Sequence, residues 1–256
     1  MNIINYHQIA ERLDEAAFNA KATEQISNYR QLNIEEAYAV QAILIARRYI
    51  RGEKLTGLKL GFTSKAKMEQ MGVHDMIWGR LTDGMLYKSG DELPKHRFIH
   101  PRAEPEIAFL FKKEVDKILH EEDMVSYLEG VAVAIEIIDS RYENFKFSLE
   151  DVIADNCSSS GYVIGQWHTP TTPIRDIGIN LSVNGTVEQE GNSNAILGNP
   201  IESLTAISRL ALEHGERIMP GHVVLAGAAT SAIFIQKGQH IEAQAEGLGS
   251  VNLNVV

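Results

Sequence analysis

Hydrophobic positions recur at two different spacings along this chain. In residues 33–52, NIEEAYAVQAILIARRYIRG, apolar residues recur at helical spacing behind a candidate N-cap, Asn33, with a glutamate three residues later. From residue 54 onward, short apolar runs rich in β-branched residues predict strands: LTGLKLGF, EIAFLF, VAVAIEIID and YVIGQW. We therefore expect an N-terminal helical region over residues 1–53, packed on a catalytic mixed-β domain over residues 54–256.

The strand pattern continues to the C-terminus, with helices between some of the strands. INLSVNGTVEQ is typical of a hairpin closed by the type I′ pair Asn184-Gly185. SLEDVIADN and NPIESLTAISRLALEHG predict two helices, the second with Pro200 near its first position and Gly215 at its end. HVVLAGA, AIFIQKG and HIEAQAEGLGSVNLNV predict the last strands. Because strands and helices do not alternate regularly, the pattern favours an α+β protein with a mixed sheet over a doubly wound one.

Composition and charge exclude several classes of protein. The chain has 256 residues and a hydrophobic content of 44%, which suits one large domain or one domain with a helical appendage. Its net charge of −10, without a basic stripe, argues against nucleic acid as a partner. We find neither an apolar run that could span a membrane nor a signal peptide. The single cysteine, Cys157, permits no internal disulfide, so we expect a cytoplasmic protein.

Two glutamates one residue apart, Glu104 and Glu106, precede the apolar run IAFLF. Residues at this spacing share one face of a strand, and like charges so close repel each other. One interpretation is a pair of solvated carboxylates on an edge strand, which Pro105 favours because proline cannot donate to a sheet. The other interpretation is that the two carboxylates converge on a cation.

A third glutamate, Glu136, lies inside the apolar strand VAVAIEIID. A lone buried charge is costly unless it is paired or bound to a metal. Arg102 and Arg141 are candidate partners for an ion pair. Alternatively, three glutamates from two strands supply the oxygen ligands that Mg²⁺ or Mn²⁺ prefers. The residues alone leave both interpretations open.

Lys59 lies between Leu58 and Leu60 in a predicted strand, so it faces away from both. On a half-buried sheet the simplest interpretation is a solvent-facing lysine. The functional alternative is a lysine that binds a substrate carboxylate or moves a proton. Lys65 and Lys67 fall on a predicted surface helix, and the surrounding GLKLGFTSKAKM does not satisfy the phosphate-loop pattern.

The stretch ADNCSSSGYVIG contains Asp155 and Cys157 just before a strand. It is typical of a helix end and turn, whose polar side chains bond to local backbone. It also suits the polar wall of a pocket. Cys157 has no histidine or lysine nearby in the sequence, so we interpret it as a buried, unreactive thiol. The histidines form no HExxH motif, and no GxSxG motif is present.

Five stretches carry a resemblance that runs in one order over nearly the whole chain: GLKLGFTSKAKMEQMGV, PRAEPEIAFLF, AIEIIDSRYENFKF, VIADNCSSS and EGLGSVNLNV. Together they resemble the fumarylacetoacetate hydrolase superfamily, and more narrowly its hydratase and decarboxylase branch from aromatic meta-cleavage pathways. The resemblance implies a mixed, rolled β-sheet with flanking helices. SRYENFKF resembles the decarboxylases of the branch. It therefore implies metal-dependent decarboxylation of 2-oxo-3-hexenedioate (4-oxalocrotonate) to 2-hydroxypenta-2,4-dienoate and CO₂.

The resemblance also implies roles for individual residues. It makes Glu104, Glu106 and Glu136 the ligands of Mg²⁺ or Mn²⁺. The residue between the first two glutamates is usually small and not proline in this family, so Pro105 is a departure that could shift the strand edge.

Three further residues take roles by the same resemblance. Lys59 becomes a catalytic residue that contacts the substrate and handles a proton. Asp155 becomes a catalytic residue of the same pocket, and Thr230, in the loop of LAGAATSA, is a candidate for binding the substrate carboxylate.

The partners follow from the resemblance as well: a small 2-oxo dicarboxylate as substrate, a homo-oligomer, and a complex with the pathway hydratase. Two alternatives stay open. One is the sister activity, hydration of 2-hydroxypenta-2,4-dienoate. The other is a non-catalytic assembly partner of the same fold.

Overall fold

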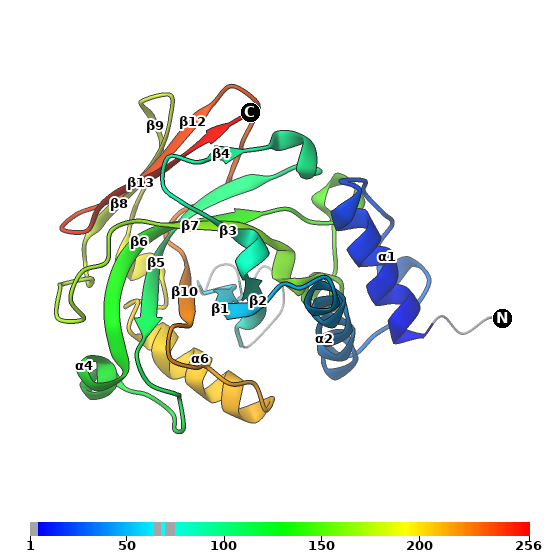
Figure 1. The fold of residues 1–256 in the computed structure, drawn as a ribbon, viewed down its shortest axis with the longest axis horizontal. Helices are drawn as coiled ribbons and strands as arrows, with labels where there is room; N and C mark the ends of the chain where they lie inside the picture. Colours follow the sequence, from blue (N-terminus) through cyan, green and yellow to red (C-terminus); the bar gives the residue numbers. More distant parts are fainter. Residues whose placement is uncertain (1–4, 64–67, 70–74) are drawn as a thin grey trace.

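Two β-sheets and a group of N-terminal helices make up the protein, and a computed structural model describes residues 5–63, 68–69 and 75–256 (Figure 1). The larger sheet contains β1 (Leu55–Gly61), β2 (Ile77–Thr82), β3 (Leu86–Tyr87), β5 (Arg102–Phe111), β6 (Leu128–Ile138), β7 (Ser159–Ile164), β10 (Val223–Ala228) and β11 (Ile233–Phe234). The smaller sheet contains β4 (Glu92–Leu93), β8 (Gly178–Val183), β9 (Thr186–Asn192), β12 (His240–Ala245) and β13 (Gly249–Val255). The described α-helices are α1 (Tyr6–Phe18), α2 (Ile34–Ile50), α4 (Met124–Tyr127), α5 (Leu149–Ala154) and α6 (Glu202–Glu213).

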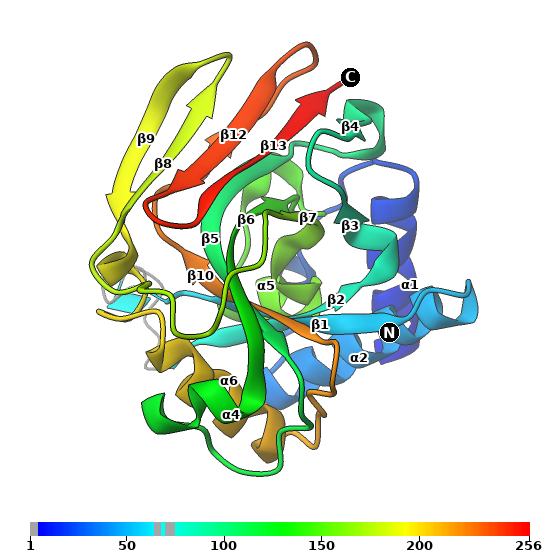
Figure 2. The same ribbon diagram turned by 60° about the vertical axis from the view of Figure 1, so that its left-hand side comes forward.

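The larger sheet is mixed and strongly curved, as Figure 2 shows, and we call its concave side the inside of the curl. Its strand order is β2-β1-β10-β5-β6-β7-β3, with β11 paired to β5 beyond the end of β10. β1 runs parallel to β10, and β3 runs parallel to β7, whereas β5 and β6 are antiparallel. The α+β prediction with a mixed, rolled sheet is confirmed. The strands that carry the three glutamates lie in the middle of this sheet.

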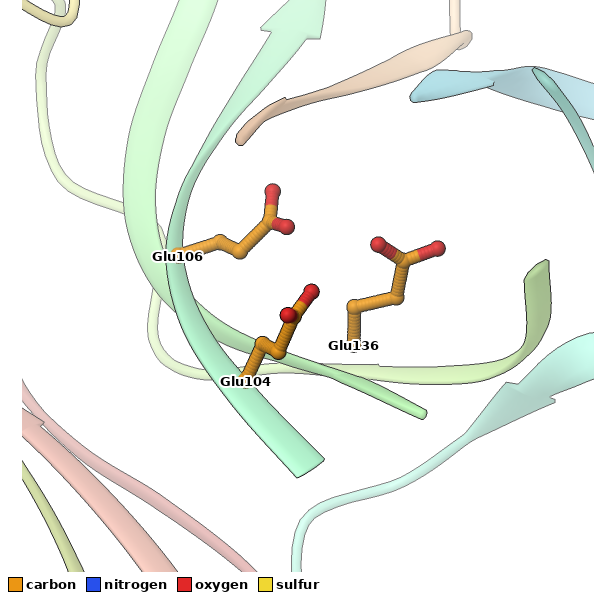
Figure 3. Close-up of side chains that lie close together, drawn as sticks. All are labelled: Glu104, Glu106 and Glu136. Carbon is orange, nitrogen blue, oxygen red and sulfur yellow. The ribbon is translucent and has the colours of Figure 1, made fainter. Parts of the chain in front are cut away.

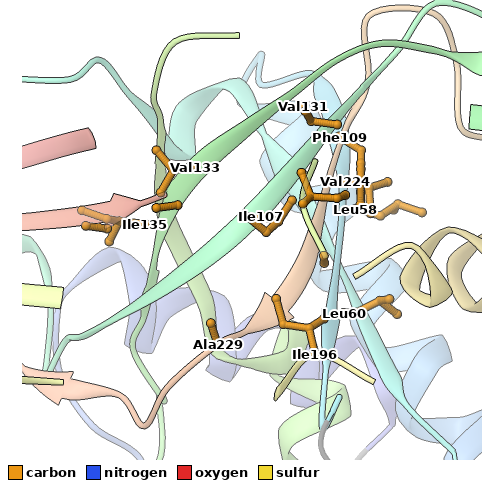
Figure 4. Packing of buried hydrophobic residues seen from close by; sticks show 14 of the residues in the cluster. Leu58, Leu60, Ile107, Phe109, Val131, Val133, Ile135, Ile196, Val224 and Ala229 are labelled. Atoms are coloured by element: carbon orange, nitrogen blue, oxygen red, sulfur yellow. The ribbon is translucent and has the colours of Figure 1, made fainter. Parts of the chain in front are cut away.

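Residues alternate between the two faces of β5 and β6, and both faces are buried. Ile107 and Phe109 of β5, with Val131, Val133 and Ile135 of β6, belong to the main hydrophobic core (Figure 4). Residues of the smaller sheet belong to the same core, because β8, β12 and β13 pack against β5 and β6. The opposite face of β5 and β6 faces the inside of the curl. Burial on both faces explains why these strands are apolar almost throughout.

The helices α1 and α2 lie together at one side of the molecule, on the right in Figure 1. The prediction for α2 is confirmed: Asn33 is its N-cap, and Glu36 completes the capping box. The carboxylate of Asp14 in α1 accepts hydrogen bonds from Arg47 and Arg51 of α2 and its C-cap, which ties the two helices together. Apolar residues of α1, α2 and α5 form a second hydrophobic cluster.

Two local predictions can be compared directly with the structure. Asn184 and Gly185 both have positive φ angles, 52° and 80°, and join β8 to β9, which confirms the type I′ hairpin. The helix α6 begins at Glu202, so Pro200 precedes its N-cap, Ile201, and does not lie at the first helical position. In the described part of the chain, no helix is both long and apolar enough to cross a membrane.

Candidate metal centre

Antiparallel pairing of β5 and β6 brings the three glutamates together. Glu104 and Glu106 share one face of β5, and Glu104 lies directly opposite Glu136 of β6. Paired residues of this kind have Cβ atoms about 5 Å apart. One carboxylate oxygen from each glutamate lies within 4.8 Å of the other two, and the three side chains converge inside the curl (Figure 3). We refer to Glu104, Glu106, Glu136 and the neighbouring Lys59 as the glutamate cluster.

The edge-strand interpretation of Glu104 and Glu106 is wrong, because β5 lies between β10 and β6. Pro105 fits this interior strand because its partner changes there. The register of β10 on β5 shifts just before Ala228, which lies opposite Glu106, and β11 pairs with the start of β5, at Ala103 and Arg102. The carbonyl of Pro105 accepts a hydrogen bond of 2.9 Å from the Ala229 N–H. Proline at this position therefore leaves both glutamates facing inward.

The glutamates are withdrawn from water to different extents. Glu136 is fully buried and Glu106 is 1% exposed, whereas Glu104 is half-buried. Burial raises the pKa of Glu106 well above its ordinary value, and the charge of Glu136 raises it further. Lys59 opposes this shift. Carboxylates that are buried this close to one another need a cation or protons to balance their charge.

Lys59 supplies part of that positive charge. Its side chain is only 3% exposed, so the solvent-facing interpretation is wrong. The Nζ atom lies 2.9 Å from Oε2 of Glu136, so the ion-pair partner of Glu136 is Lys59. The sequence-based candidates Arg102 and Arg141 are wrong, and Arg141 pairs with Asp155 instead.

Burial alone would lower the pKa of Lys59, but the negative charges of Glu136, Glu106 and Glu104 act together to raise that pKa above its ordinary value. Lys59 therefore carries a positive charge beside three carboxylates.

The cluster fits a divalent metal ion better than it fits an ion pair alone. When ionised, three carboxylates and one ammonium leave an excess of negative charge. Within the described residues, neither oxygen of Glu136 accepts a hydrogen bond, even though Lys59 is close enough for an ion pair. A buried carboxylate without hydrogen bonds is costly. An all-oxygen ligand set of this kind suits Mg²⁺ or Mn²⁺.

Gly227, near the end of β10, holds Glu106 in place. The sequence analysis did not identify this role. Its backbone N–H donates a hydrogen bond of 2.7 Å to Oε2 of Glu106. The φ angle of Gly227 is 111°, a conformation that favours glycine. A Cβ atom there would lie 2.2 Å from Oγ1 of the buried Thr63. The only available signal was a glycine inside the strand HVVLAGA, which suggests a close backbone approach.

Asp155 lies at the end of α5, fully buried. Its carboxylate accepts hydrogen bonds from the backbone N–H and the Nε–H of Arg141. The remaining guanidinium hydrogen bonds of Arg141 include those to the Asp139 carbonyl and to the Ser160 hydroxyl. The structure therefore makes Asp155 the partner of Arg141, and a role for it in catalysis stays a prediction.

Thr230 follows β10 in the loop that leads to β11. Its hydroxyl donates to the Ser231 carbonyl, and its methyl group lies against Gly191 of the smaller sheet. In the described part of the chain, no hydrogen bond joins Thr230 to the glutamate cluster. Its role as a carboxylate-binding residue stays a prediction.

Cys157 is 3% exposed, and its thiol donates to the Trp78 carbonyl at 3.1 Å. Burial raises the pKa of this thiol to about 12, so it is protonated and unreactive at neutral pH, as the sequence predicted. Lys65 and Lys67 lie outside the described residues.

Comparison with known proteins adds a family and specific relatives. Residues 71–256 match the family model for the fumarylacetoacetate (FAA) hydrolase C-terminal region. A 4-oxalocrotonate decarboxylase from a Pseudomonas species is 47% identical over 96% of this chain and 96% of its own length. A 2-hydroxyhexa-2,4-dienoate hydratase from Comamonas testosteroni is 31% identical over 95% of this chain and 94% of its own length.

A solved structure is similar over almost the whole fold. It is the 4-oxalocrotonate decarboxylase from Pseudomonas putida G7, complexed with magnesium and adipate, with a TM-score of 0.93 and 34% sequence identity. The match covers 98% of this chain and 97% of that one.

Proposed function

Because the chain belongs to the fumarylacetoacetate hydrolase family, we propose that it is a metal-dependent carboxy-lyase that converts 2-oxo-3-hexenedioate to 2-hydroxypenta-2,4-dienoate and CO₂. The glutamate cluster carries this proposal, because three carboxylate oxygens converge there and, in the described residues, both oxygens of the buried Glu136 accept no hydrogen bond. The decarboxylase of known structure contains magnesium together with adipate, a six-carbon dicarboxylate like the proposed substrate.

In this proposal Glu104, Glu106 and Glu136 bind Mg²⁺ or Mn²⁺. When bound, the ion supplies Lewis-acid polarisation of the substrate's 2-oxo group, worth several kcal/mol of transition-state stabilisation. The glutamates contribute a fixed ligand set, because β5 and β6 are both interior strands that the core holds in register.

The substrate itself contains the path for the electrons. Its departing carboxylate is joined to the 2-oxo group through a double bond. When the C5–C6 bond breaks, its electron pair forms the C4=C5 double bond, and the former C3=C4 pair moves to C2=C3. The 2-oxo oxygen takes the negative charge, and a proton on that oxygen completes the product. The remaining task of the protein is to orient the substrate, to exclude water and to move one proton.

Lys59 suits the proton and the orientation. Its ammonium group, held beside Glu136 in a buried strand, can donate to an oxygen of a 2-oxo acid bound at the glutamates. Apolar side chains on the same strand face exclude water below the cluster. They include Ala108, Ala134 and Leu225, all fully buried.

The proposal is tested by CO₂ release from 2-oxo-3-hexenedioate, measured with Mg²⁺ and again after EDTA. We expect release that requires the metal. Absence of release under both conditions would contradict the decarboxylase, and the same preparation should then be given 2-hydroxypenta-2,4-dienoate. Formation of 4-hydroxy-2-oxopentanoate would identify the sister hydratase, which the 31% identical relative keeps as the second candidate. Inactivity with both substrates would favour a non-catalytic partner.

Several finer proposals rest on the sequence pattern or on the family resemblance. We propose that the protein is a cytoplasmic homo-oligomer that associates with the pathway hydratase, and that residues 1–53 form a helical region packed on the catalytic domain. Sedimentation of the protein alone and mixed with the hydratase tests the assembly. Asp155 and Thr230 are retained as proposed pocket residues.

A further inference from the structure

Arg102 begins β5 two residues before Glu104, so both side chains start from the same face of the strand. The regular register of β5 on β6 extends through this residue, which lies opposite Ile138. Along that face, Glu104 and Glu106 follow Arg102, and the apolar Ala108 comes next. The face that carries the two glutamates therefore has Arg102 at one end and the apolar Ala108 at the other.

Two aromatic rings enclose the guanidinium of Arg102. Its central carbon lies 3.9 Å from the ring centroid of Phe145 and 4.2 Å from that of Phe234. Phe145 belongs to the SRYENFKF stretch, and Phe234 comes from β11. Rings on its faces favour the cation and leave its N–H groups, which lie in the guanidinium plane, for an acceptor.

Within the described residues, the guanidinium of Arg102 has unused hydrogen-bonding capacity. Its Nε–H is buried without an acceptor, and the charge of Glu104 acts on the guanidinium without a close ion pair between them. Arg141 is the opposite case, because Asp155 and nearby carbonyls accept from it. Glu104 is the nearest acid in sequence, and the proposed metal site already uses its charge. A buried donor without a partner, next to a site for an anionic substrate, indicates a ligand acceptor.

The spacing suits a six-carbon dicarboxylate. Two residues along a strand span about 7 Å. The five carbon–carbon bonds of such a substrate span about 6 Å when extended. A 2-oxo acid with its first carboxylate and its oxo group at the glutamates would therefore extend its second carboxylate toward the Arg102 end of the face.

We infer that Arg102, held between Phe145 and Phe234, binds the substrate carboxylate that departs as CO₂ and so makes the site select dicarboxylates. This inference rests on the proposed function. A planar guanidinium fixed by two rings binds a carboxylate in a defined orientation. That orientation holds the C5–C6 bond for cleavage, and the electron pair leaves toward the oxo end, away from the arginine. A monocarboxylate substrate, such as that of a hydratase, would gain nothing from Arg102.

The test uses two ligands that differ only in the distal carboxylate: 2-oxohexanedioate and 2-oxohexanoate. Their dissociation constants are measured by calorimetry with Mg²⁺ present, on the wild-type protein and on Arg102→Met. We expect the wild type to prefer the dicarboxylate, and Arg102→Met to weaken dicarboxylate binding about 10- to 100-fold. Binding of 2-oxohexanoate should stay unchanged, which also verifies that the variant is folded and holds the metal.

Two further variants sharpen the result. Phe234→Leu removes an exposed ring at little risk to folding and should reduce the dicarboxylate preference about threefold. Arg12→Met is the matched control, because Arg12 also lies over a ring, that of Tyr29, but belongs to α1. It should change neither dissociation constant.

Three outcomes would overturn the inference: a wild type that binds both ligands equally, an Arg102→Met variant that retains the preference, or one in which both ligands weaken equally. The last outcome would assign Arg102 a purely structural role. Each of these leaves the decarboxylase proposal to the CO₂ assay. A wild type that binds neither 2-oxo acid would overturn both proposals.

Discussion

Two buried groups of charged residues lie in this fold, and they differ in how completely their charges and hydrogen bonds are matched by protein partners. The guanidinium of Arg141 is balanced by Asp155, and carbonyl and hydroxyl oxygens accept its other hydrogen bonds. The glutamate cluster has three carboxylates for one ammonium, and Glu136 accepts no hydrogen bond in the described structure.

The difference shows how a structural ion pair can be told from a functional one. The Arg141–Asp155 pair gains nothing from an additional ligand, so its cost of desolvation is already offset by its own hydrogen bonds. In the glutamate cluster, by contrast, the oxygens of the buried Glu136 accept no hydrogen bond from the described residues, so a bound cation would add to its stability. Burial alone does not separate the two, because Asp155 and Glu136 are equally buried.

The sharpest test of this contrast is Glu136→Gln, which keeps the shape of the side chain and removes its charge. We expect Mg²⁺-dependent CO₂ release to fall about a thousandfold, since a Lewis acid contributes several kcal/mol to the transition state. The matched control is Glu129→Gln, an exposed glutamate on the same strand, β6, which should retain full activity. Metal-dependent turnover in Glu136→Gln would contradict the assignment of this ligand.

Stability should change in opposite ways at the two groups when no metal is present. We expect Asp155→Asn to lower the free energy of unfolding by about 3 kcal/mol, because it leaves the buried Arg141 without its charge partner. Glu106→Gln removes a repelled carboxylate, so it should leave that free energy unchanged or raise it by about 1 kcal/mol. Urea unfolding in EDTA measures both. Equal destabilisation by the two substitutions would remove the distinction between the groups.

A smaller effect is expected from Gly227→Ala, which leaves all charges in place. The new methyl group would collide with Thr63 and displace the N–H that orients Glu106, so Mg²⁺ affinity should fall about 10- to 100-fold. Gly238→Ala is the control, since Gly238 also has a positive φ angle, 87°, but no atom lies within 4 Å of the added methyl. Calorimetric titration with Mg²⁺ compares the two. Equal affinity in both variants would exclude a role for the Gly227 N–H.

Per pH unit, the smallest predicted effect is the pH dependence of metal binding. The pKa of Glu106 is raised by burial and by the charge of Glu136, so its carboxylate retains a proton above the ordinary range. A ligand must lose its proton before it binds a metal, so Mg²⁺ affinity should rise with pH and fall by up to about tenfold per unit below that pKa. Titrations between about pH 5 and pH 8 measure this slope. A flat profile would show that the cluster is already ionised.

Much of the fold could be predicted from short stretches, because its signals are local. The Asn33 N-cap with Glu36, and the Asn184-Gly185 turn, each involve residues that are neighbours in the chain. Register between distant strands has no such local signal. The position of Glu136 opposite Glu104 depends on pairing across a long connection, and only the resemblance to a family indicated it.

The errors arose where local rules assumed a half-exposed sheet. Lys59 was interpreted as solvent-facing because it alternates with Leu58 and Leu60, but the larger sheet curls and buries both faces of β1. Pro105 suggested an edge, although β5 merely exchanges one partner strand for another there. The roles of Gly227 and Arg102 at the site depend on contacts between distant segments, which form only when the sheet is assembled.

The Glu104–Glu136 pairing also links magnesium to the lifetime of the folded state. The ligand set exists only after β5 and β6 have paired, so an unfolded chain offers no equivalent site. Once free metal exceeds the dissociation constant, each further tenfold rise in its concentration adds about 1.4 kcal/mol to the free energy of unfolding. Without metal, the three carboxylates repel one another and oppose that strand pairing. A cell short of magnesium would then lose folded protein as well as catalytic turnover.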